Sequence, residues 1–174
     1  MLECLRLLLH KYDEMNDTKR FCRPLFEAIY IIHYLGSPEG LIRYGRLSKE
    51  VKNHNLIKTA FRISIDFMNS HYYRVIRQLH KLKLTILLIV GSFHIPKVYL
   101  ITLQRMSHAY GSKNSKFPLS VLTKWLCPSY GQESKARQFT IELCQFYGMP
   151  IQDEFVILSK NHFNEKAGLV SQIF

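Results

Sequence analysis

The chain of 174 residues is long enough for one domain, or for a helical body with one small appended module. With 47% hydrophobic and 13% aromatic residues, its composition excludes a disordered chain. The net charge of +11 is unevenly distributed, because residues 67–132 contain nine Lys and Arg and no Asp or Glu. Such a stretch favours a polyanionic partner: nucleic acid, an anionic membrane or an acidic protein segment. The alternative is a basic face that only keeps the protein in solution.

The first part of the chain has the pattern of successive helices. The residues from Cys22 to Leu35 are rich in apolar side chains, and Gly36 is expected to end this helix. Ser37 and Pro38 are expected to begin the next helix, as its N-cap and its first residue. Further along, apolar residues recur at the spacing of one helical face, which predicts a third helix: Ile57, Ala60, Phe61, Ile65 and Met68.

The segment from His71 to Lys81 combines a buried stripe with a basic ridge. Its apolar residues are Tyr72, Val75, Ile76 and Leu79. On the opposite side, polar residues repeat at the same helical spacing: Arg74, Arg77, Gln78 and Lys81. This ridge offers phosphate contacts. Tyr72 is expected in the core, whereas Tyr73 is either a core residue or a stacking platform.

Residues 82–92 have an ambiguous pattern. The run from Leu84 to Gly91 suits a buried strand or a buried helix, and the absence of further strands before residue 150 favours the helix. The run is also the longest aliphatic one, and it is too short for a membrane span of ~20 residues. Ile95 and Pro96 are expected to open the next helix, and residues 111–115 form the clearest loop and the expected boundary between modules.

After this loop the pattern changes to that of a winged helix-turn-helix. A short strand at 116–119, a short helix at 120–126 and a longer helix at 132–147 are expected, followed by a β-prone segment at 154–158. Lys135 and Arg137 lie near the start of the longer helix, where a recognition helix meets nucleic acid. Lys160 and His162 are expected at the tip of the wing. Trp125, on the short helix, is expected to be a core residue of the winged helix that contacts no ligand.

The sequence lacks the residue patterns of a catalytic or metal centre. It contains no GxSxG, P-loop, GxGxxG or HExxH motif, and the acid-free middle lacks carboxylates for catalysis. The four cysteines form no CxxC pair, and the histidines supply no partner at metal-ligand spacing. We therefore expect a protein that is not an enzyme and that holds no metal or cofactor.

An ordered set of segments resembles the Sac/GANP family, the relatives of the germinal-centre-associated nuclear protein. The resemblance covers roughly residues 20 to 165. Its segments are 25–28, 35–39, 71–77, 95–96 with 105–110, 117–119 with Leu122 and Leu126, 146–148 and 156–163.

The resemblance implies an all-α, helical-repeat (TPR/PCI-like) solenoid, about residues 1–111, capped by a C-terminal winged helix with a small β-hairpin, about 116–174. It implies a scaffold of nuclear messenger RNA export that pairs with a PCI-type protein and a small acidic protein and binds RNA or single-stranded nucleic acid. The alternative within the family is a protein-interaction module of the centrosome and spindle. The expected location is the nucleus, or the centrosome and cytoplasm in the alternative.

The residues at the two ends of the chain support the expectation of a protein partner. Leu2 to Leu9 is apolar on nearly every side, and the tail contains Leu169, Val170, Ile173 and Phe174. The alternative is that Leu2–Leu9 packs onto the helix at Cys22–Leu35. For nucleic acid, the candidate contacts are Arg74, Arg77, Lys81, Lys83, Lys113, Lys116, Lys124, Lys135, Arg137 and Lys160.

Overall fold

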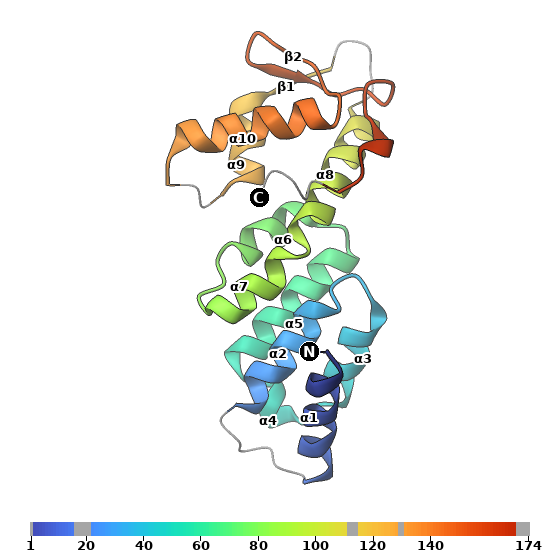
Figure 1. Ribbon diagram of the computed structural model, residues 1–174, viewed down its shortest axis with the longest axis vertical. Helices are drawn as coiled ribbons and strands as arrows, with labels where there is room; N and C mark the ends of the chain where they lie inside the picture. Colours follow the sequence, from blue (N-terminus) through green and yellow to red (C-terminus); the bar gives the residue numbers. More distant parts are fainter. Residues whose placement is uncertain (1, 16–21, 111–114, 129–130, 170–174) are drawn as a thin grey trace. The chain divides into compact units, whose positions relative to one another are not determined.

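The computed structural model describes residues 2–15, 22–110, 115–128 and 131–169, which are mostly helical with one small sheet (Figure 1). These residues form two compact units. The first unit contains the described residues up to 71 together with 82–92, and the second contains 72–81 and those from 93 onward. The units do not coincide with the expected modules, 1–111 and 116–174. That division into a helical body and a winged-helix module stays a prediction.

The first unit is built around one central helix, α2. Its helices are α1 (Leu2–Glu14), α2 (Arg23–His33), α3 (Pro38–Arg46), α4 (Lys49–Lys52), α5 (Asn55–Met68) and α7 (Thr85–Ser92). Helix α2 packs against α1, α3, α5 and α7, most extensively against α5. Its side chains Ala28, Ile31 and Ile32 are completely buried. The expected start of α3 is confirmed, because the Ser37 side chain accepts a hydrogen bond from the Glu39 backbone.

Gly36 makes a close contact with Phe67 of α5. Gly36 has a φ of +84°, and a Cβ atom there would lie 2.6 Å from the ring of Phe67. The missing side chain therefore gives Phe67 room to pack in the core, where it is 8% exposed. Met68, expected on the buried face, is 49% exposed. The expected face is therefore confirmed at Ile57 and Ala60, which are completely buried, and wrong at Met68, because Phe67 occupies the core next to Gly36.

The expected helix over residues 82–92 is confirmed as α7, but its burial is only one-sided. Leu87 and Val90 are buried against the unit. The exposed apolar side chains of this segment are Leu84, Ile86, Leu88 and Ile89, which are between 40% and 50% exposed. Among the described residues, no single helix is long and apolar enough to cross a membrane, and α7 and α8 reach that length only as a pair.

Helix α1 packs onto α2, as the alternative for the N-terminal leucines proposed. Leu9 and Tyr12 are buried, and the Tyr12 ring stacks on Phe26 of α2 with centroids 6.5 Å apart. Leu7 remains 58% exposed. Val170, Ile173 and Phe174 lie outside the described residues.

The second unit combines helices with the sheet. Its elements are α6 (Tyr72–Leu79), α8 (Ile95–Ala109), β1 (Lys116–Pro118), α9 (Leu119–Leu126), α10 (Glu133–Phe146), β2 (Ile151–Gln152), β3 (Phe155–Ile157) and the 3-10 helix η1 (Glu165–Ala167). The strand order is β1-β3-β2, and both pairings are antiparallel. Helix α9 packs against α10, β1 and α6 (Figure 1). The Tyr99 hydroxyl of α8 donates to the Leu126 carbonyl at 2.9 Å, which ties α8 to the end of α9.

Candidate nucleic-acid interface

Helix α6 exposes the expected basic ridge because its opposite face is buried in the core. Tyr72, Val75, Ile76 and Leu79 are all buried, at the spacing of one helical face. Arg74 and Arg77 are exposed on the opposite side, and Lys81 is exposed just beyond the end of the helix. The expected core position of Tyr72 is confirmed. Its ring also lies 5.0 Å below the guanidinium of Arg105 of α8.

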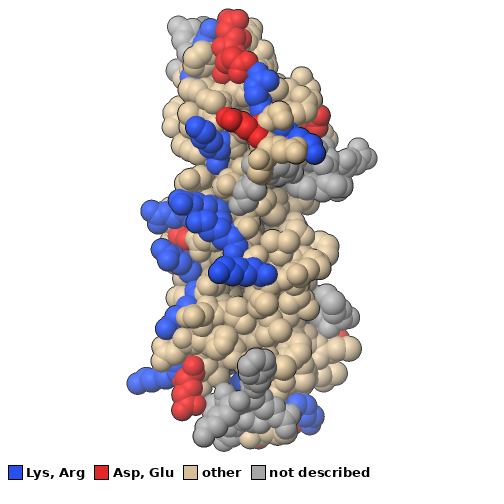
Figure 2. Space-filling model, turned by 90° about the vertical axis from the view of Figure 1, so that its left-hand side faces the viewer, with Lys and Arg blue, Asp and Glu red and all other residues tan. Residues whose placement is uncertain are grey.

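A groove of about 580 Å³ in the second unit brings together cations from three helices. Arg77 comes from α6, Lys124 from α9 and Arg137 from α10, and all three are exposed. We call this feature the basic groove. Its lining residues are Tyr73, Arg77, Ser120, Thr123, Lys124, Cys127, Pro128, Glu133, Ala136 and Arg137. Figure 2 shows exposed Lys and Arg side chains on the visible surface, with few Asp and Glu side chains beside them.

Two carboxylates modify the charge of the basic groove. Glu133, in the first turn of α10, is part of its lining. Arg137 forms an exposed ion pair with Glu154 in the turn between β2 and β3. Arg77 and Lys124 are therefore the lining cations that remain for a polyanion, whereas Arg137 would have to exchange its carboxylate for a phosphate.

The one aromatic ring among the described lining residues, that of Tyr73, packs against a ring cluster that does not line the groove. The ring centroids of Tyr73 and Trp125 are 5.6 Å apart, and those of Trp125 and Phe117 are 5.3 Å apart. Tyr73 is 39% exposed, which makes it a surface residue rather than a core residue. Trp125 is half-buried, so its expected core position is correct only in part. It packs on one side and borders solvent on the other.

Among the described candidates, those outside the groove lining are Arg74, Lys81, Lys83, Lys116, Lys135 and Lys160. Lys116 on β1 and Lys135 on α10 are exposed. Lys83 belongs to the other compact unit, and Lys113 lies outside the described residues.

The expected wing tip at Lys160 and His162 is wrong. The hairpin turn between β2 and β3 is formed by Asp153 and Glu154, which have φ angles of 48° and 66°. Lys160 follows β3, beyond the sheet. The β-propensity of residues 154–158 predicted the second strand of the hairpin. The first strand, Ile151–Gln152, was missed because its two residues give no comparable signal. The turn is therefore acidic where a basic tip was expected.

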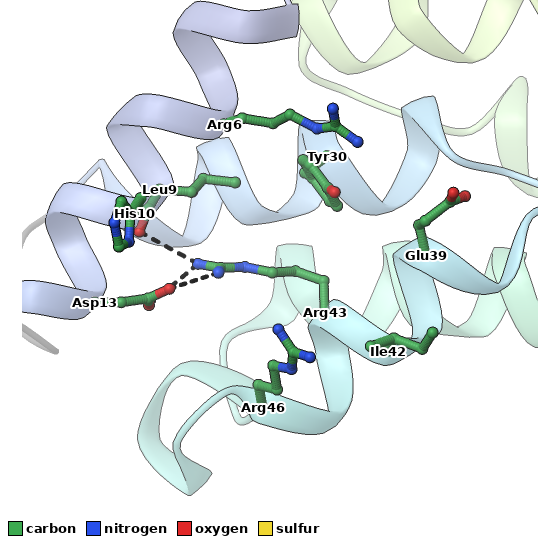
Figure 3. A pocket seen from close by; sticks show the side chains of 9 residues that line it. All are labelled: Arg6, Leu9, His10, Asp13, Tyr30, Glu39, Ile42, Arg43 and Arg46. Atoms are coloured by element: carbon green, nitrogen blue, oxygen red, sulfur yellow. Dashed lines mark hydrogen bonds and ion pairs between the residues drawn. The ribbon is translucent and has the colours of Figure 1, made fainter.

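A second concavity, of about 320 Å³, lies in the first unit between α1, α2 and α3 (Figure 3). Its lining residues are Arg6, Leu9, His10, Asp13, Tyr30, Glu39, Ile42, Arg43 and Arg46. The Arg43 guanidinium reaches from α3 to the carboxylate of Asp13 on α1, at 2.5 Å. Carboxylates and cations are thus mixed in this concavity, and its central arginine is already paired.

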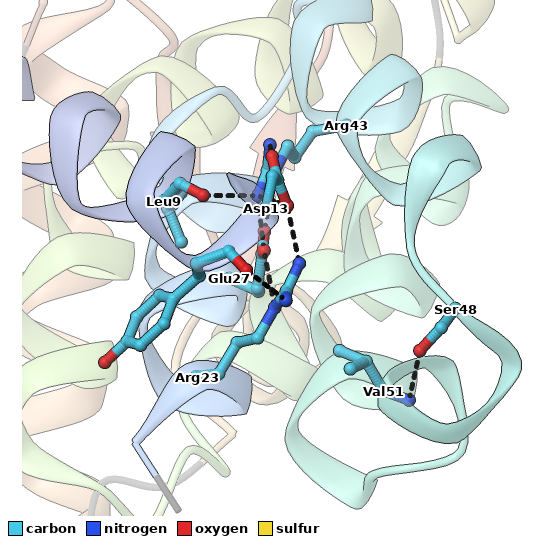
Figure 4. A network of polar contacts seen from close by, with 8 residues as sticks. Leu9, Asp13, Arg23, Glu27, Arg43, Ser48 and Val51 are labelled. Carbon is cyan, nitrogen blue, oxygen red and sulfur yellow. Dashed lines mark hydrogen bonds and ion pairs between the residues drawn. The ribbon is translucent and has the colours of Figure 1, made fainter. Parts of the chain in front are cut away.

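The pairing of Arg43 is part of a buried network that sequence analysis did not anticipate (Figure 4). Glu27 on α2 is completely buried, and its carboxylate accepts hydrogen bonds from Arg43 at 2.6 and 2.8 Å. Arg23, 6% exposed, donates to Asp13 at 2.6 Å and to the Tyr12 carbonyl at 3.0 Å. Burial alone would lower the pKa of Arg43, but the hydrogen bonds to Glu27 and Asp13 raise it above its ordinary value. The network therefore joins α1, α2 and α3.

Metal binding finds no support in the described part of the chain. No group of three or more His, Cys, Asp or Glu side chains there is arranged to hold a metal ion. Cys127 and Cys144 are buried, whereas Cys4 and Cys22 are exposed.

Comparison with known proteins identifies a family for this chain. Curated protein sequences gave no match to the chain. The pattern of the SAC3/GANP family matches residues 1–153, which is most of the 174 residues. The match contains both compact units up to β2, including the basic groove. The chain belongs to the SAC3/GANP family.

Proposed function

We propose that this chain is a non-enzymatic scaffold of nuclear messenger RNA export that binds nucleic acid through its basic groove. At family level, SAC3/GANP membership suggests a scaffold related to messenger RNA export. The observation that carries the nucleic-acid part is the convergence of Arg77, Lys124 and Arg137 from three helices on one groove. Lys and Arg bind nucleic acid mainly through its phosphates, and such contacts do not require a sequence motif.

The order of elements supports a winged helix in the second unit. A strand is followed by a short helix, α9, and a longer helix, α10, and then by an antiparallel hairpin that pairs with the first strand. In this arrangement α10 is the recognition helix, and Arg137 and Lys135 lie in its first half. Because the hairpin turn contains Asp153 and Glu154, the wing contributes no cation at its tip. We therefore place the contacts on the helices.

A matched pair of lysine variants tests the basic groove. Lys124→Glu should weaken RNA binding and flatten the salt slope by about 0.7, the contribution of one phosphate contact on a single strand, and adding Arg77→Glu should double that change. Lys97→Glu is the control, because Lys97 is also an exposed helical lysine of the second unit but does not line the groove. Binding measured by fluorescence anisotropy over a salt series gives both quantities. Equal losses in the control and the groove variant, or salt-independent binding, would contradict the proposal.

A protein-binding role is supported by the apolar face of α7. The exposed side chains Leu84, Ile86, Leu88 and Ile89 belong to one short segment, and grouped apolar exposure of this kind marks protein interfaces. We propose that this face takes part in pairing with a second PCI-type protein, in a complex that also contains a small acidic protein. Ile86→Asp with Ile89→Asp should abolish co-purification of partners from cells, while Leu7→Asp on α1 should preserve it. Recovery of centrosomal proteins without export factors would instead favour the spindle role.

A further inference from the structure

We propose that Tyr73 is a stacking platform for an unpaired nucleobase, so that the basic groove selects single-stranded over duplex nucleic acid. This inference rests on the proposed nucleic-acid function of the groove and adds a specificity-determining residue to it. Its basis is the position of an exposed aromatic ring in the lining of a groove that also contains Arg77 and Lys124.

The Tyr73 ring is held in place although it is exposed. It packs against the ring of Trp125, which in turn packs against Phe117, at centroid distances of 5.6 and 5.3 Å. Trp125 is half-buried and therefore anchored in the second unit, whereas 39% of Tyr73 remains open to solvent. A ring supported on one side loses little freedom when a base packs on it, which favours stacking.

The cations lie where a stacked nucleotide needs them. Arg77 follows Tyr73 by four residues on α6, so the two side chains share a helical face. Lys124 immediately precedes Trp125 on α9 and lines the same groove. A phosphate on Arg77 or Lys124 would leave its base within the groove that Tyr73 borders. Single-strand-binding proteins combine the same two elements, a basic groove and aromatic rings.

An acidic protein segment fits the groove less well than a nucleic-acid strand. Its carboxylates would match Arg77 and Lys124, but they would also meet Glu133 in the lining. Binding of such a segment would also not explain why the exposed Tyr73 ring is supported by Trp125. A duplex has its bases already stacked on one another, so it presents phosphates to the cations but no free base to Tyr73.

Substitutions at Tyr73 separate stacking from charge. Tyr73→Leu keeps an apolar side chain against Trp125 but removes the aromatic face, and Tyr73→Phe keeps that face. Binding of a single-stranded oligoadenylate of about 12 nucleotides should weaken about tenfold in Tyr73→Leu and change little in Tyr73→Phe. Binding of a blunt RNA duplex of the same length should be the same in all three proteins. The salt slope for the single strand should also be unchanged, since no cation is removed.

Trp125 provides a second measurement that needs no variant. It is the sole tryptophan of the chain, and it contacts the Tyr73 ring. Oligoadenylate should change its fluorescence, whereas inorganic polyphosphate, bound through the same cations, should leave it unchanged. Equal weakening of single strand and duplex by Tyr73→Leu, or an equal fluorescence response to both polyanions, would overturn the stacking role.

The two proposals fail in different ways. If only the stacking role fails, the protein still binds RNA in a salt-dependent way, and Arg77→Glu with Lys124→Glu weakens this binding. Failure of the proposed function appears as wild-type protein that binds neither strand nor duplex, or that binds polyglutamate as tightly as RNA.

Discussion

In the first unit, Arg23 and Arg43 are largely buried and paired with Asp13 and Glu27, whereas in the second unit Arg77 and Lys124 are exposed beside a groove. The sequence explains much of this difference. Residues 1–66 contain eight Asp and Glu, and residues 67–132 contain none. A cation near carboxylates can be buried in pairs, while one without them has to remain in water or meet an anionic partner. The first unit therefore uses Arg23 and Arg43 for cohesion, whereas the second has Arg77 and Lys124 available for binding.

The largest expected effect is the loss of the buried carboxylate at Glu27. Glu27→Gln removes the negative charge that faces both Arg43 and Arg23, and leaves two largely buried guanidinium groups with only Asp13. Breaking a buried ion pair on one side costs about 3–5 kcal/mol of unfolding free energy. Amide hydrogen exchange of α1, α2 and α3 measures this loss in the first unit.

The matched control for Glu27 is Glu50→Gln on α4. Glu50 is exposed, so the same chemical change should alter the unfolding free energy by less than ~0.5 kcal/mol. Equal exchange rates in the two variants would show that the network does not stabilise the first unit.

The second largest expected difference between the two units is the reactivity of their cysteines, and here the buried side chains belong to the second unit. Cys4 and Cys22 of the first unit are exposed, whereas Cys127 and Cys144 of the second are buried. Burial raises the pKa of Cys127 from its ordinary value of 9.0 to about 11, and that of Cys144 to about 12. At pH 8 the thiolate fraction of Cys127 is then about 100-fold below that of an ordinary thiol, before steric protection is counted.

Reaction with a disulfide reagent measures how many of the four thiols are accessible in the native protein. Two thiols should react rapidly in the native protein, and the other two only after unfolding in urea. Raising the pH from 8 toward 10 should accelerate the slow pair, because it increases their thiolate fraction. Rapid reaction of three or four thiols in the native state would show that the core around Cys127 and Cys144 is open.

Local patterns in the sequence predicted the helices well, since periodicity and capping operate within a few residues. The start at Ser37 and Pro38 and the core position of Tyr72 follow from such signals. The helical state of residues 85–92 does not, because it was inferred from the absence of further strands before residue 150. The one-sided burial of α7 did not follow. Its apolar residues lie on all sides, so the sequence contains no period that identifies the exposed face.

Contacts between distant residues account for what was missed in the two sites. The pair between Arg43 and Glu27 spans 16 residues and joins different helices, so its spacing carries no signal. The i, i+4 spacing of Arg23 and Glu27 within an apolar helix was the available hint. In the groove, Arg77, Lys124 and Arg137 were each expected to bind nucleic acid, but only the fold shows that they share one groove.

Substitutions of Trp125 test how much of the stability of the second unit comes from the ring cluster of Tyr73, Trp125 and Phe117. Emptying a fully buried Trp site costs about 3–5 kcal/mol, and the half-buried position of Trp125 should reduce this to about 2 kcal/mol for Trp125→Ala. Trp125→Phe, which keeps a ring against Phe117 and Tyr73, should retain most of that stability. Urea unfolding followed by circular dichroism compares the two variants. A loss as large as that of Glu27→Gln would mean that the ring cluster is core rather than surface.

The smallest expected effect concerns the stability contributed by the cations of the groove. Lys124 is exposed, and no Asp or Glu occurs within 50 residues on its N-terminal side, whereas Glu133 shares the groove lining with it. Lys124→Glu should change the unfolding free energy by less than ~0.5 kcal/mol, because exposed charges interact weakly through water.

Salt provides the check on this last effect. In about 1 M salt the screening length falls to ~3 Å, so any difference between Lys124→Glu and the wild type should disappear. Trp125 fluorescence in urea is the suitable probe, because it reports on the second unit alone. A destabilisation of about 2 kcal/mol or more that persists in high salt would mean that Lys124 is a structural cation like Arg43, and the contrast between the two units would then be lost.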